Sequence, residues 1–496
     1  GLFLSLSAFA QQISIKGHVV DAAGEPVIGA SVVEESTTNG TITDIDGNFS
    51  LKVSPKSMLT VSFIGYATQT VPVNGKTSLT ITLKEDTEVL DEVVVIGYGT
   101  MKKSDLTGAI SSVSSKDLMK QPSPSLGAAL QGRATGLQVI SSGAPGDNVS
   151  MKIRGIGSIN NSDPLLVIDG VPTDVPLNMI NMDDVETVDV LKDASATAIY
   201  GSRGSNGVIL ITTKGGSEGK ASITFDASVG LSTVRKQYEL LNAYEYATAL
   251  NDIRGSSTIS AEDLEAYKNG TKGINWADLI THTGITQDYR LSISGGNAKV
   301  KYLISGNMLD QEAVTIRTDY KRYGIRANID ADVKPWLTIS AKMNASSLHK
   351  HNDGANWFHI TNFSPTMEMK DPETGIYNRD PYNIANGSNP YGELMVNYSD
   401  SYSYNLNANL TLLFKIMKGL TFSVQGGYDY DHSPSYSFKS KLEAPGAINS
   451  MNNTSNMHNY WQNTNNLTWQ RQFGDHNVTA MAVWEISRSW DTGLQG

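Results

Sequence analysis

Residues Tyr404–Phe414 read YNLNANLTLLF, and this stretch decides the fold class. Apolar side chains stand at every even position from 404 to 414, and Asn or Thr stands at the odd positions from 405 to 411. A period of two is typical of a β-strand with two unlike faces. Soluble sandwiches also alternate, but so long a strand with so polar a second face suits a lipid-facing wall around a wet lumen.

The same period continues in the neighbouring stretches 322–330 and 337–344. Tyr323, Ile325 and Ile329 alternate there with Arg322 and Arg326. We therefore expect several long antiparallel strands between residues 221 and 496. Aromatic residues of the kind that form interfacial girdles lie in or near these strands: Tyr289, Tyr302, Trp336, Tyr428, Tyr430, Trp469 and Trp484.

Connections between these strands are of two kinds. Gly295–Asn297 and Phe473–Asp475 are short turns, whereas Leu240–Thr286 and His349–Asp400 are long. Short turns at one end and long loops at the other are typical of outer-membrane barrels. We count about ten strands, against the 22 of plugged outer-membrane transporters. An open sheet would leave unpaired edge groups in hydrocarbon, so we expect this chain to be the first part of a larger barrel.

Composition excludes several classes of protein. The 496 residues exceed one ordinary domain, and the net charge of −11 without a basic tract argues against a nucleic-acid partner. The chain has no Cys, which excludes disulfides and thiolate metal sites. No apolar run reaches the ~18 residues of a transmembrane helix.

Strand and helix signals alternate between Lys102 and Gly216, which predicts an α+β domain. Pro122–Leu130 and Ala194–Tyr200 have helical signals, and Val208–Thr213 is a continuous apolar strand. Two glycine-rich spots might suggest nucleotide binding. The first, at 155–157, lacks the third glycine of a dinucleotide site, and the second, at 201–207, lacks the Lys of a phosphate loop.

Residues Leu90–Thr100 read LDEVVVIGYGT, with two acids before four β-branched residues. Val93–Ile96 would pair readily as a strand. No obvious partner strand lies beside it in sequence, so we interpret it as a site for strand addition by another protein. An ordinary buried strand is the alternative interpretation.

Residues 11–84 predict a small β-sandwich, because short β pieces are separated by turn chemistry. Asp44 and Asp46 before Gly47 invite a calcium interpretation, but the spacing of an EF-hand loop is missing, and a hairpin turn is favoured. Residues 1–10 are typical of the rear of a signal peptide. The expected strands are Ile13–Val20, Ala30–Val33, Gly40–Thr43, Asn48–Val53, Leu59–Phe63 and Leu79–Leu83.

Taken together, these segments resemble the SusC/RagA family of TonB-dependent outer-membrane receptors. The resemblance is carried by Leu90–Thr100, Ile153–Gly155, Asn161–Pro172 and Val190–Lys214. It implies a mainly β chain: a carboxypeptidase-regulatory-like β-sandwich at 11–84, a linker with the TonB box at 85–101, and an α+β plug at 102–216. The N-terminal part of a 22-strand transmembrane antiparallel β-barrel would follow at 221–496.

The resemblance also implies site residues. Arg154 and Arg203 look like plug arginines that face barrel carboxylates, and the alternative is that both are solvated loop residues. The TonB-binding strand would consist of Asp91, Glu92, Val93, Val94 and Val95.

The function implied is active import through the outer membrane of a Gram-negative bacterium, with the N-terminal domain and TonB box in the periplasm. The partners would be TonB with ExbB and ExbD, a SusD-like surface lipoprotein, membrane lipid, and an oligosaccharide or less often a peptide as cargo. Such import has no chemical step, so we expect no catalytic residue, cofactor or metal. A passive porin or adhesin, a signalling receptor and a periplasmic hydrolase are the alternatives.

Two sets of loop residues complete the candidates. His349, His351 and His359 could ligate a metal, although chance spacing is the favoured interpretation. Aromatic loop residues would suit stacking on sugars, or could simply pack within the loop: Trp357, Phe358, Tyr377, Tyr382 and Tyr391.

Overall fold

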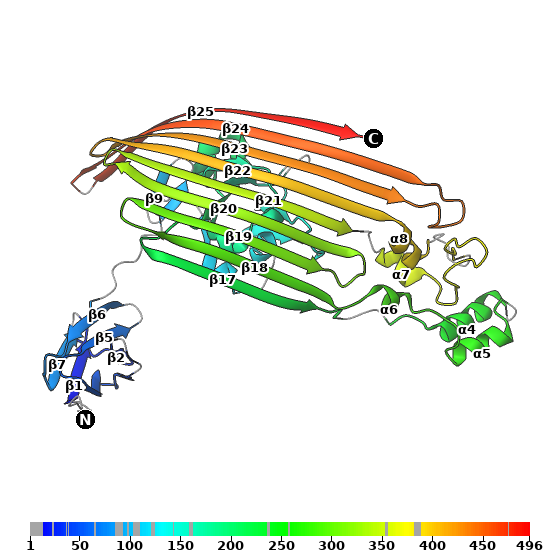
Figure 1. Ribbon diagram of the computed structural model, residues 1–496, viewed down its shortest axis with the longest axis horizontal. Helices are drawn as coiled ribbons and strands as arrows, with labels where there is room; N and C mark the ends of the chain where they lie inside the picture. The colour runs from blue at the N-terminus through cyan, green and yellow to red at the C-terminus, as the bar shows by residue number, and fades with distance from the viewer. Residues whose placement is uncertain are drawn as a thin grey trace, which may run out of the picture. The chain divides into compact units, whose positions relative to one another are not determined.

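The computed structural model forms two compact units, one with the β-sandwich and one with the plug and a long antiparallel sheet (Figure 1). No helix among the described residues is both long and apolar enough to cross a membrane. The structure describes residues 13–84, 93–96, 99–102 and 110–496, except 22–23, 36, 38, 64–65, 121–124, 142, 158–161, 236–238, 256–257, 353–355, 381–387 and 475. The expected signal-peptide remnant at 1–10 lies outside them.

The first unit is a β-sandwich, as predicted. One sheet has the order β4-β1-β7 and the other has the order β3-β2-β5-β6, and the inward-facing side chains of both form one core. The strands are β1 (Ile13–Val20), β2 (Ser31–Glu34), β3 (Gly40–Ile42), β4 (Asn48–Val53), β5 (Met58–Phe63), β6 (Tyr66–Pro72) and β7 (Ser78–Thr82).

Two details of the sandwich differ from the prediction. Strand β6 was not expected, because its sequence YATQTVP is polar and ends in a proline, which suits only an edge strand. The turn at Asp46-Gly47 does not close a hairpin, since β3 and β4 belong to different sheets. Gly47 nevertheless adopts a φ of 74°, and Asp44 accepts the backbone N–H groups of Asp46 and Asn48.

The plug is built on a five-stranded sheet of order β10-β15-β16-β13-β14 with a separate β11-β12 pair. Strand β16 is the centre of this sheet, and its apolar run is buried on both faces. The elements are β10 (Ile110–Ser114), α1 (Ser115–Leu118), α2 (Leu126–Ala129), β11 (Leu137–Ile140), β12 (Ser150–Ile153), β13 (Leu165–Ile168), β14 (Val171–Thr173), η2 (Leu177–Met179), η3 (Met182–Asp184), β15 (Val185–Leu191), α3 (Ala194–Thr197), η4 (Ala198–Gly204) and β16 (Val208–Thr213).

The second unit is completed by nine strands that pair antiparallel in sequence order, close to the number expected. In Figure 1 these strands run side by side in front of the plug. They are β17 (Gly219–Ser232), β18 (Gly284–Gly296), β19 (Val300–Glu312), β20 (Thr318–Lys334), β21 (Leu337–Asn352), β22 (Tyr398–Met417), β23 (Leu420–Lys439), β24 (Ser450–Phe473) and β25 (His476–Gln495).

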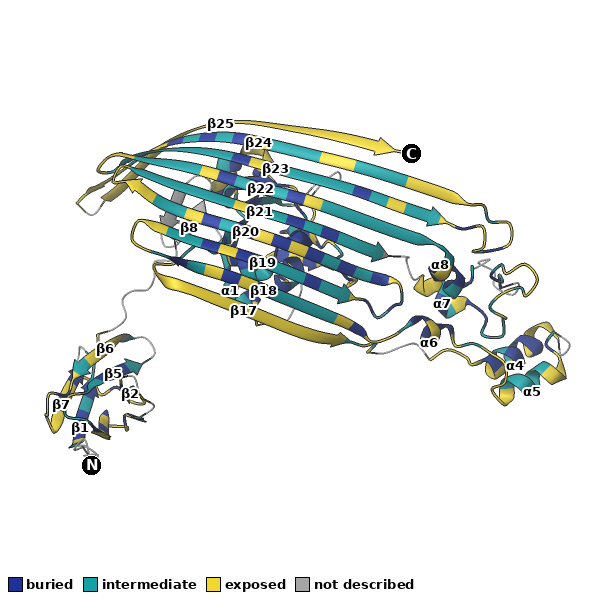
Figure 2. Cartoon of the chain, in the orientation of Figure 1, coloured by how far each residue is buried: buried dark blue, intermediate teal, exposed yellow. Residues whose placement is uncertain are grey.

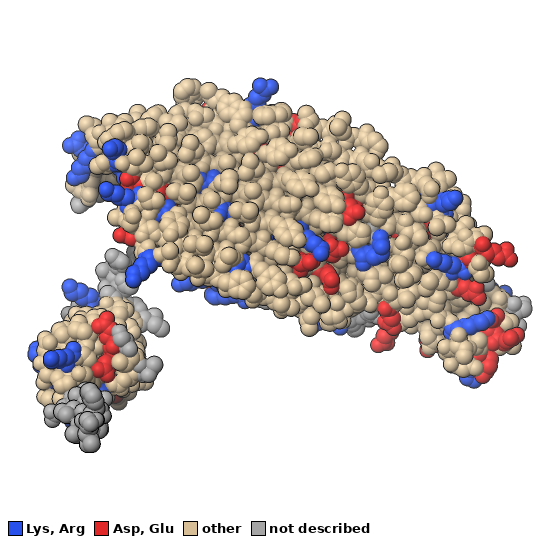
Figure 3. All heavy atoms as spheres, in the orientation of Figure 1, with Lys and Arg blue, Asp and Glu red and all other residues tan. Residues whose placement is uncertain are grey.

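The two faces of this sheet differ as the period of two predicts. On β20, Tyr323, Ile325 and Ile329 are exposed, whereas Arg322 and Arg326 are buried against the plug. Burial alternates clearly along β20 from Thr318 to Ile329 and in the middle of β22 (Figure 2). The outer face is largely uncharged over the strands, and charged side chains gather toward the strand ends (Figure 3).

Long connections at one end of the sheet carry short helices. Between β17 and β18 lie α4 (Ala243–Arg254), α5 (Ala261–Lys268) and α6 (Trp276–Ile280). Between β21 and β22 lie α7 (Trp357–Asn362) and α8 (Pro390–Val396). Trp276 and Phe363 from the two connections meet edge to face at 5.1 Å, so the connections share one core.

Candidate functional site: the TonB-box strand and the plug–sheet interface

The expected TonB box is described only in part. Asp91 and Glu92 lie outside the described residues, and Val93–Val95 are described as backbone within strand β8 (Val93–Ile96). Strand β8 forms a two-stranded sheet with β9 (Gly99–Lys102), so the expectation that it lacks a partner nearby in sequence is wrong. Only two residues separate these strands in sequence.

The turn of one plug hairpin carries a carboxylate that is buried against the long antiparallel sheet. Asp169, between β13 and β14, has a φ of 50°, which Asp tolerates better than most residues. Its Oδ1 lies 2.8 Å from Nζ of Lys342 on β21, and its Oδ2 lies 3.9 Å from NH1 of Arg326. Thr213 of the plug also donates its hydroxyl to Asp169 Oδ2, at 2.7 Å.

The surroundings of Asp169 keep it ionised. Burial alone would raise its pKa, but Lys342 and Arg326 outweigh that effect, and the pKa lies below its usual range. Its backbone carbonyl accepts from Asn409 Nδ2 at 2.6 Å and from Gln425 Nε2 at 3.2 Å. The tip of this plug hairpin is thus held by side chains from β20, β21, β22 and β23.

A second plug carboxylate, Asp184, binds the same wall. It is 1% exposed, and its Oδ1 lies 2.9 Å from the Ser305 hydroxyl and 3.3 Å from NH2 of Arg290. Its Oδ2 lies 3.4 Å from Nε of Arg326. Arg326 therefore stands between the two plug carboxylates, Asp169 and Asp184.

Backbone carbonyls of the plug supply further contacts. Arg322, 1% exposed, donates through NH1 to the carbonyls of Asn178 at 2.7 Å and Ile180 at 3.2 Å. Tyr320 donates its hydroxyl to the Asn178 carbonyl at 2.9 Å. Asn328 donates to Thr213 and to the Lys214 carbonyl, so β20 contacts the plug along much of its length.

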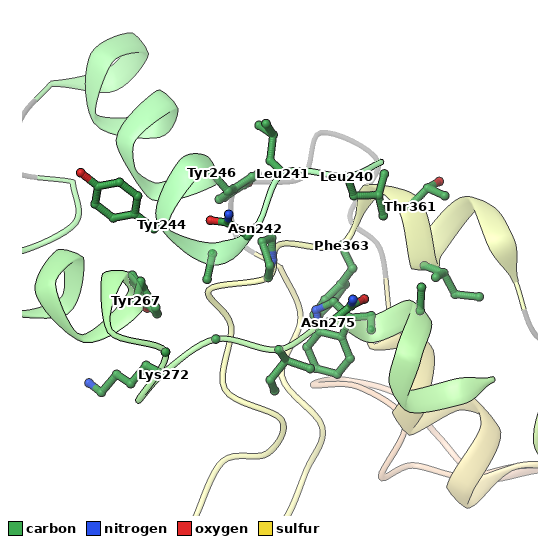
Figure 4. A pocket seen from close by; sticks show the side chains of 18 of the residues that line it. Leu240, Leu241, Asn242, Tyr244, Tyr246, Tyr267, Lys272, Asn275, Thr361 and Phe363 are labelled. Carbon is green, nitrogen blue, oxygen red and sulfur yellow. The ribbon is translucent and has the colours of Figure 1, made fainter. Parts of the chain in front are cut away.

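A cavity of about 750 Å³ lies between the two long connections. Figure 4 shows Tyr244, Tyr246 and Tyr267 on one side of it, with Asn275 and Phe363 on the other. Both polar and apolar side chains line it.

The candidate loop residues divide into exposed and packed groups. Trp357 and Phe358 on α7 are exposed, whereas Tyr377 is buried beside Tyr391. Tyr382 lies outside the described residues. The described part of the chain contains no group of three or more His, Cys, Asp or Glu residues arranged to hold a metal. His349 and His351 both contact Asp400, and His359 contacts Glu393.

Comparison with known proteins gives the same architecture. Residues 102–208 match the TonB-dependent Receptor Plug Domain family, and residues 15–95 match the CarboxypepD_reg-like domain family. Over 400 residues the chain is 41% identical to the TonB-dependent receptor SusC of Bacteroides thetaiotaomicron, covering 78% of this chain and 38% of that protein. It shares its fold with the RagAB peptide importer in the open-open state (TM-score 0.67, 24% identity, 82% of this chain and 50% of that chain).

The chain belongs to the SusC/RagA family of TonB-dependent receptors. The TonB-dependent receptor P3 of Formosa agariphila is 33% identical over 506 residues, which cover 98% of this chain and 49% of that protein. The chain thus spans about half the length, or less, of the curated relatives it matches. The long sheet corresponds to part of a TonB-dependent barrel.

The two plug arginines expected in this receptor have different surroundings. Arg203 donates to Tyr460 Oη at 3.0 Å and to Glu485 Oε1 at 2.6 Å, on barrel strands β24 and β25. Arg154 instead forms an ion pair with Asp193 of the plug itself. Arg154 thus pairs within the plug among the described residues, and the docking role expected of both arginines stays a prediction.

Sequence analysis of this SusC/RagA receptor missed the plug carboxylates. It assigned no role to Asp169 or Asp184. One signal could have indicated the interface: Arg322, Arg326 and Lys342 all fall on the polar face of strands whose other face is apolar. Cations on an inner face need partners, and a plug is the body that could supply them.

Proposed function

We propose that this chain is the N-terminal part of a TonB-dependent importer in the outer membrane of a Gram-negative bacterium. Its plug would close the barrel lumen at rest, and its N-terminal sandwich and TonB box would lie in the periplasm. Residues 11–84 would form the sandwich, 85–101 the linker, 102–216 the plug, and 221–496 the first part of a 22-strand barrel. The barrel would be embedded in outer-membrane lipid.

One observation carries this proposal: a plug domain is seated against the polar face of a sheet whose other face is largely apolar and largely uncharged. Such a sheet face suits lipid. A passive porin would not need a domain that fills its lumen. The plug is held by hydrogen bonds and ion pairs to several strands, and such contacts can exchange for water when the plug is displaced.

Energy would enter through strand β8. Among the described residues, β8 pairs with β9 on one edge only, so its other edge could accept a further strand. TonB, driven by ExbB and ExbD, would pair with Asp91, Glu92, Val93, Val94 and Val95 by strand addition, in which main-chain hydrogen bonds supply most of the affinity. Force on this strand would then pass to the plug, because β8 lies directly before it in sequence.

The cargo we propose is an oligosaccharide, captured together with a SusD-like surface lipoprotein. Trp357 and Phe358 are exposed on α7 and are suited to stacking on sugar rings. A peptide is the second candidate, because the RagAB complex, which shares this fold, is a peptide importer. Transport of either cargo involves no catalytic step.

Uptake by cells with and without TonB tests the proposal. Cells that produce the full-length receptor and its lipoprotein would be grown on defined oligosaccharides or peptides as the limiting nutrient. We expect growth on an oligosaccharide that requires both the receptor and TonB. Equal growth without TonB would refute energised import, and receptor-dependent growth on peptides alone would refute the oligosaccharide assignment.

A further inference from the structure

The ion pairs that join plug and barrel have an uneven charge pattern. In all of the described pairs but one, the plug supplies the acid and the barrel supplies the base. The exception is Arg203 with Glu485 on β25. Lys350 also follows the main pattern, because it pairs with Asp147 of the plug.

The barrel cations of this pattern are concentrated on β18, β20 and β21. Arg290, Arg322 and Arg326 are 7%, 1% and 2% exposed, and Lys342 lies beside them on the neighbouring strand. The Nε atoms of Arg290 and Arg322 are buried and lack a hydrogen-bond partner among the described residues, whereas Nε of Arg326 lies 3.4 Å from Oδ2 of Asp184. We call these four residues the cationic sector of the barrel wall.

The partners of the cationic sector belong mainly to the plug. Asp184 forms ion pairs with Arg290 and Arg326, and Asp169 forms ion pairs with Arg326 and Lys342. Arg322 donates hydrogen bonds to the backbone carbonyls of residues 178 and 180. The barrel itself offers Asp226, whose Oδ2 lies 3.6 Å from NH1 of Arg290, and Asp288 on β18. For Arg326 and Lys342, every ion pair between described residues is to the plug.

Elsewhere on the described barrel wall, acidic side chains take the place of the buried cations. Asp429 accepts from Asn405 and Asn407, and Asp431 accepts from Ser403, so these barrel acids are partnered within the barrel. Acids of this part of the wall lie on β23 and β25, whereas the described barrel cations that would lose a plug carboxylate include Arg290, Arg326 and Lys342 on β18, β20 and β21. Displacement of the plug would remove two carboxylates from this sector at once.

We propose that the cationic sector is an anion-binding surface of the transport passage, which pairs with the plug at rest and with carboxylate or sulfate groups of the cargo during import. This inference rests on the proposed function, since it needs a plug that moves. Buried guanidinium groups that lose their counter-charges favour a replacement anion. Basic side chains along a pore wall select anions by the same physics.

The test uses the full-length receptor in planar bilayers, with urea added to release the plug. The barrel should persist under these conditions, because lipid prevents its strands from exposing backbone groups. The probes are trigalacturonate, which is anionic, and maltotriose, a neutral trisaccharide. We expect trigalacturonate to block the conductance and maltotriose not to. The block should weaken as salt concentration rises.

Three variants locate the block. Lys342→Gln and the double variant Arg326→Gln/Lys342→Gln should weaken the trigalacturonate block, the double variant by roughly tenfold, because each removed charge is worth a few-fold in water. Lys321→Gln is the matched control, since Lys321 is on β20 but pairs with Asp310. Lys342 is the less buried of the two, so its single variant remains informative if the double variant inserts poorly.

Equal block by both trisaccharides, or an unchanged block in the double variant, would overturn the inference. Neither result would bear on the proposal of energised import, because the bilayer assay contains no TonB. Conversely, TonB-independent growth would refute the proposed function whatever the block. If Lys321→Gln weakened the trigalacturonate block as much as Lys342→Gln does, that result would also overturn the assignment to the cationic sector.

Discussion

Replacing Asp169 by Asn should loosen the plug from the barrel wall. Asn tolerates the left-handed backbone at this position about as well as Asp, so the hairpin itself should survive. The change removes the carboxylate that lies 2.8 Å from Lys342 and 3.9 Å from Arg326. It also takes away one of the two acceptor oxygens that Thr213 uses.

The magnitude follows from burial. The side chain of Asp169 is almost fully buried, so loss of the anion takes the carboxylate from Lys342 and leaves the buried Arg326 with Asp184 alone. Breaking a buried pair costs about 3 kcal/mol at the lower end of the usual range, and the partial exposure of Lys342 favours that lower end. A loss of about 3 kcal/mol corresponds to roughly 100-fold weaker protection against local opening.

Hydrogen exchange on the full-length receptor measures this change at the amides of β16, the central strand of the plug. Asp163→Asn is the matched control, because Asp163 forms an exposed pair with Lys152 within the plug, and such pairs contribute about 0.5 kcal/mol. Equal loss of protection in the two variants would refute the argument that the Asp169 contacts hold the plug.

Other outcomes follow from the same contacts. The pKa of Asp169 is lowered in the folded protein, so the stability that its ionised carboxylate contributes should be complete above about pH 4. That stability should be lost as the pH falls through the lower pKa of the folded protein. When plug unfolding by urea is followed against pH, Asp169→Asn should not show this loss of stability in acid. Arg203→Gln should lower plug protection by about 1.5 kcal/mol, because it removes a charged partner from Glu485, and Arg154→Gln by less than about 0.5 kcal/mol; hydrogen exchange that gives the reverse order would contradict the structure. Gly17→Val should destabilise the sandwich by about 3 kcal/mol, since a Cβ there would lie 2.2 Å from the Phe49 ring, and an unchanged melting transition of that domain would be the contrary result.

The long sheet could be predicted from sequence because its signal is local. In the stretch 404–411 apolar and polar residues alternate, and burial in β22 alternates with them from 404 to 410. The same is true of the sandwich strands, with β6 as the exception. Its residues are polar at an edge where one side meets solvent, so the strand lacks a periodic apolar pattern.

The plug–barrel contacts could not be predicted in detail, because they join residues far apart in sequence. Asp169 and Lys342 are separated by 173 positions, and no local pattern relates them. Arg154 and Arg203 both lie next to glycines and look alike in sequence, yet one pairs within the plug and the other reaches β24 and β25. Only the folded arrangement decides which charges meet.

The pairing of β8 with β9 was missed for a different reason. The sequence of residues 99–102 lacks a strong β signal, so Val93–Ile96 appeared to have no partner nearby. Pairing between adjacent strands needs little propensity when the connection is short. TonB would then meet a two-stranded sheet and add a third strand to it.

The most direct test of energised import through this strand is a paired measurement on Val94→Pro in the full-length receptor. Proline removes a main-chain donor and fixes φ within β8. Val94→Ile keeps the main-chain donor and leaves φ free to adopt the strand value, so it is the control. Surface binding and intracellular accumulation of labelled cargo would be measured in the same cells. We predict normal binding with background accumulation for Val94→Pro, and normal values of both for Val94→Ile. Normal accumulation with Val94→Pro would contradict the role of this strand in energised import.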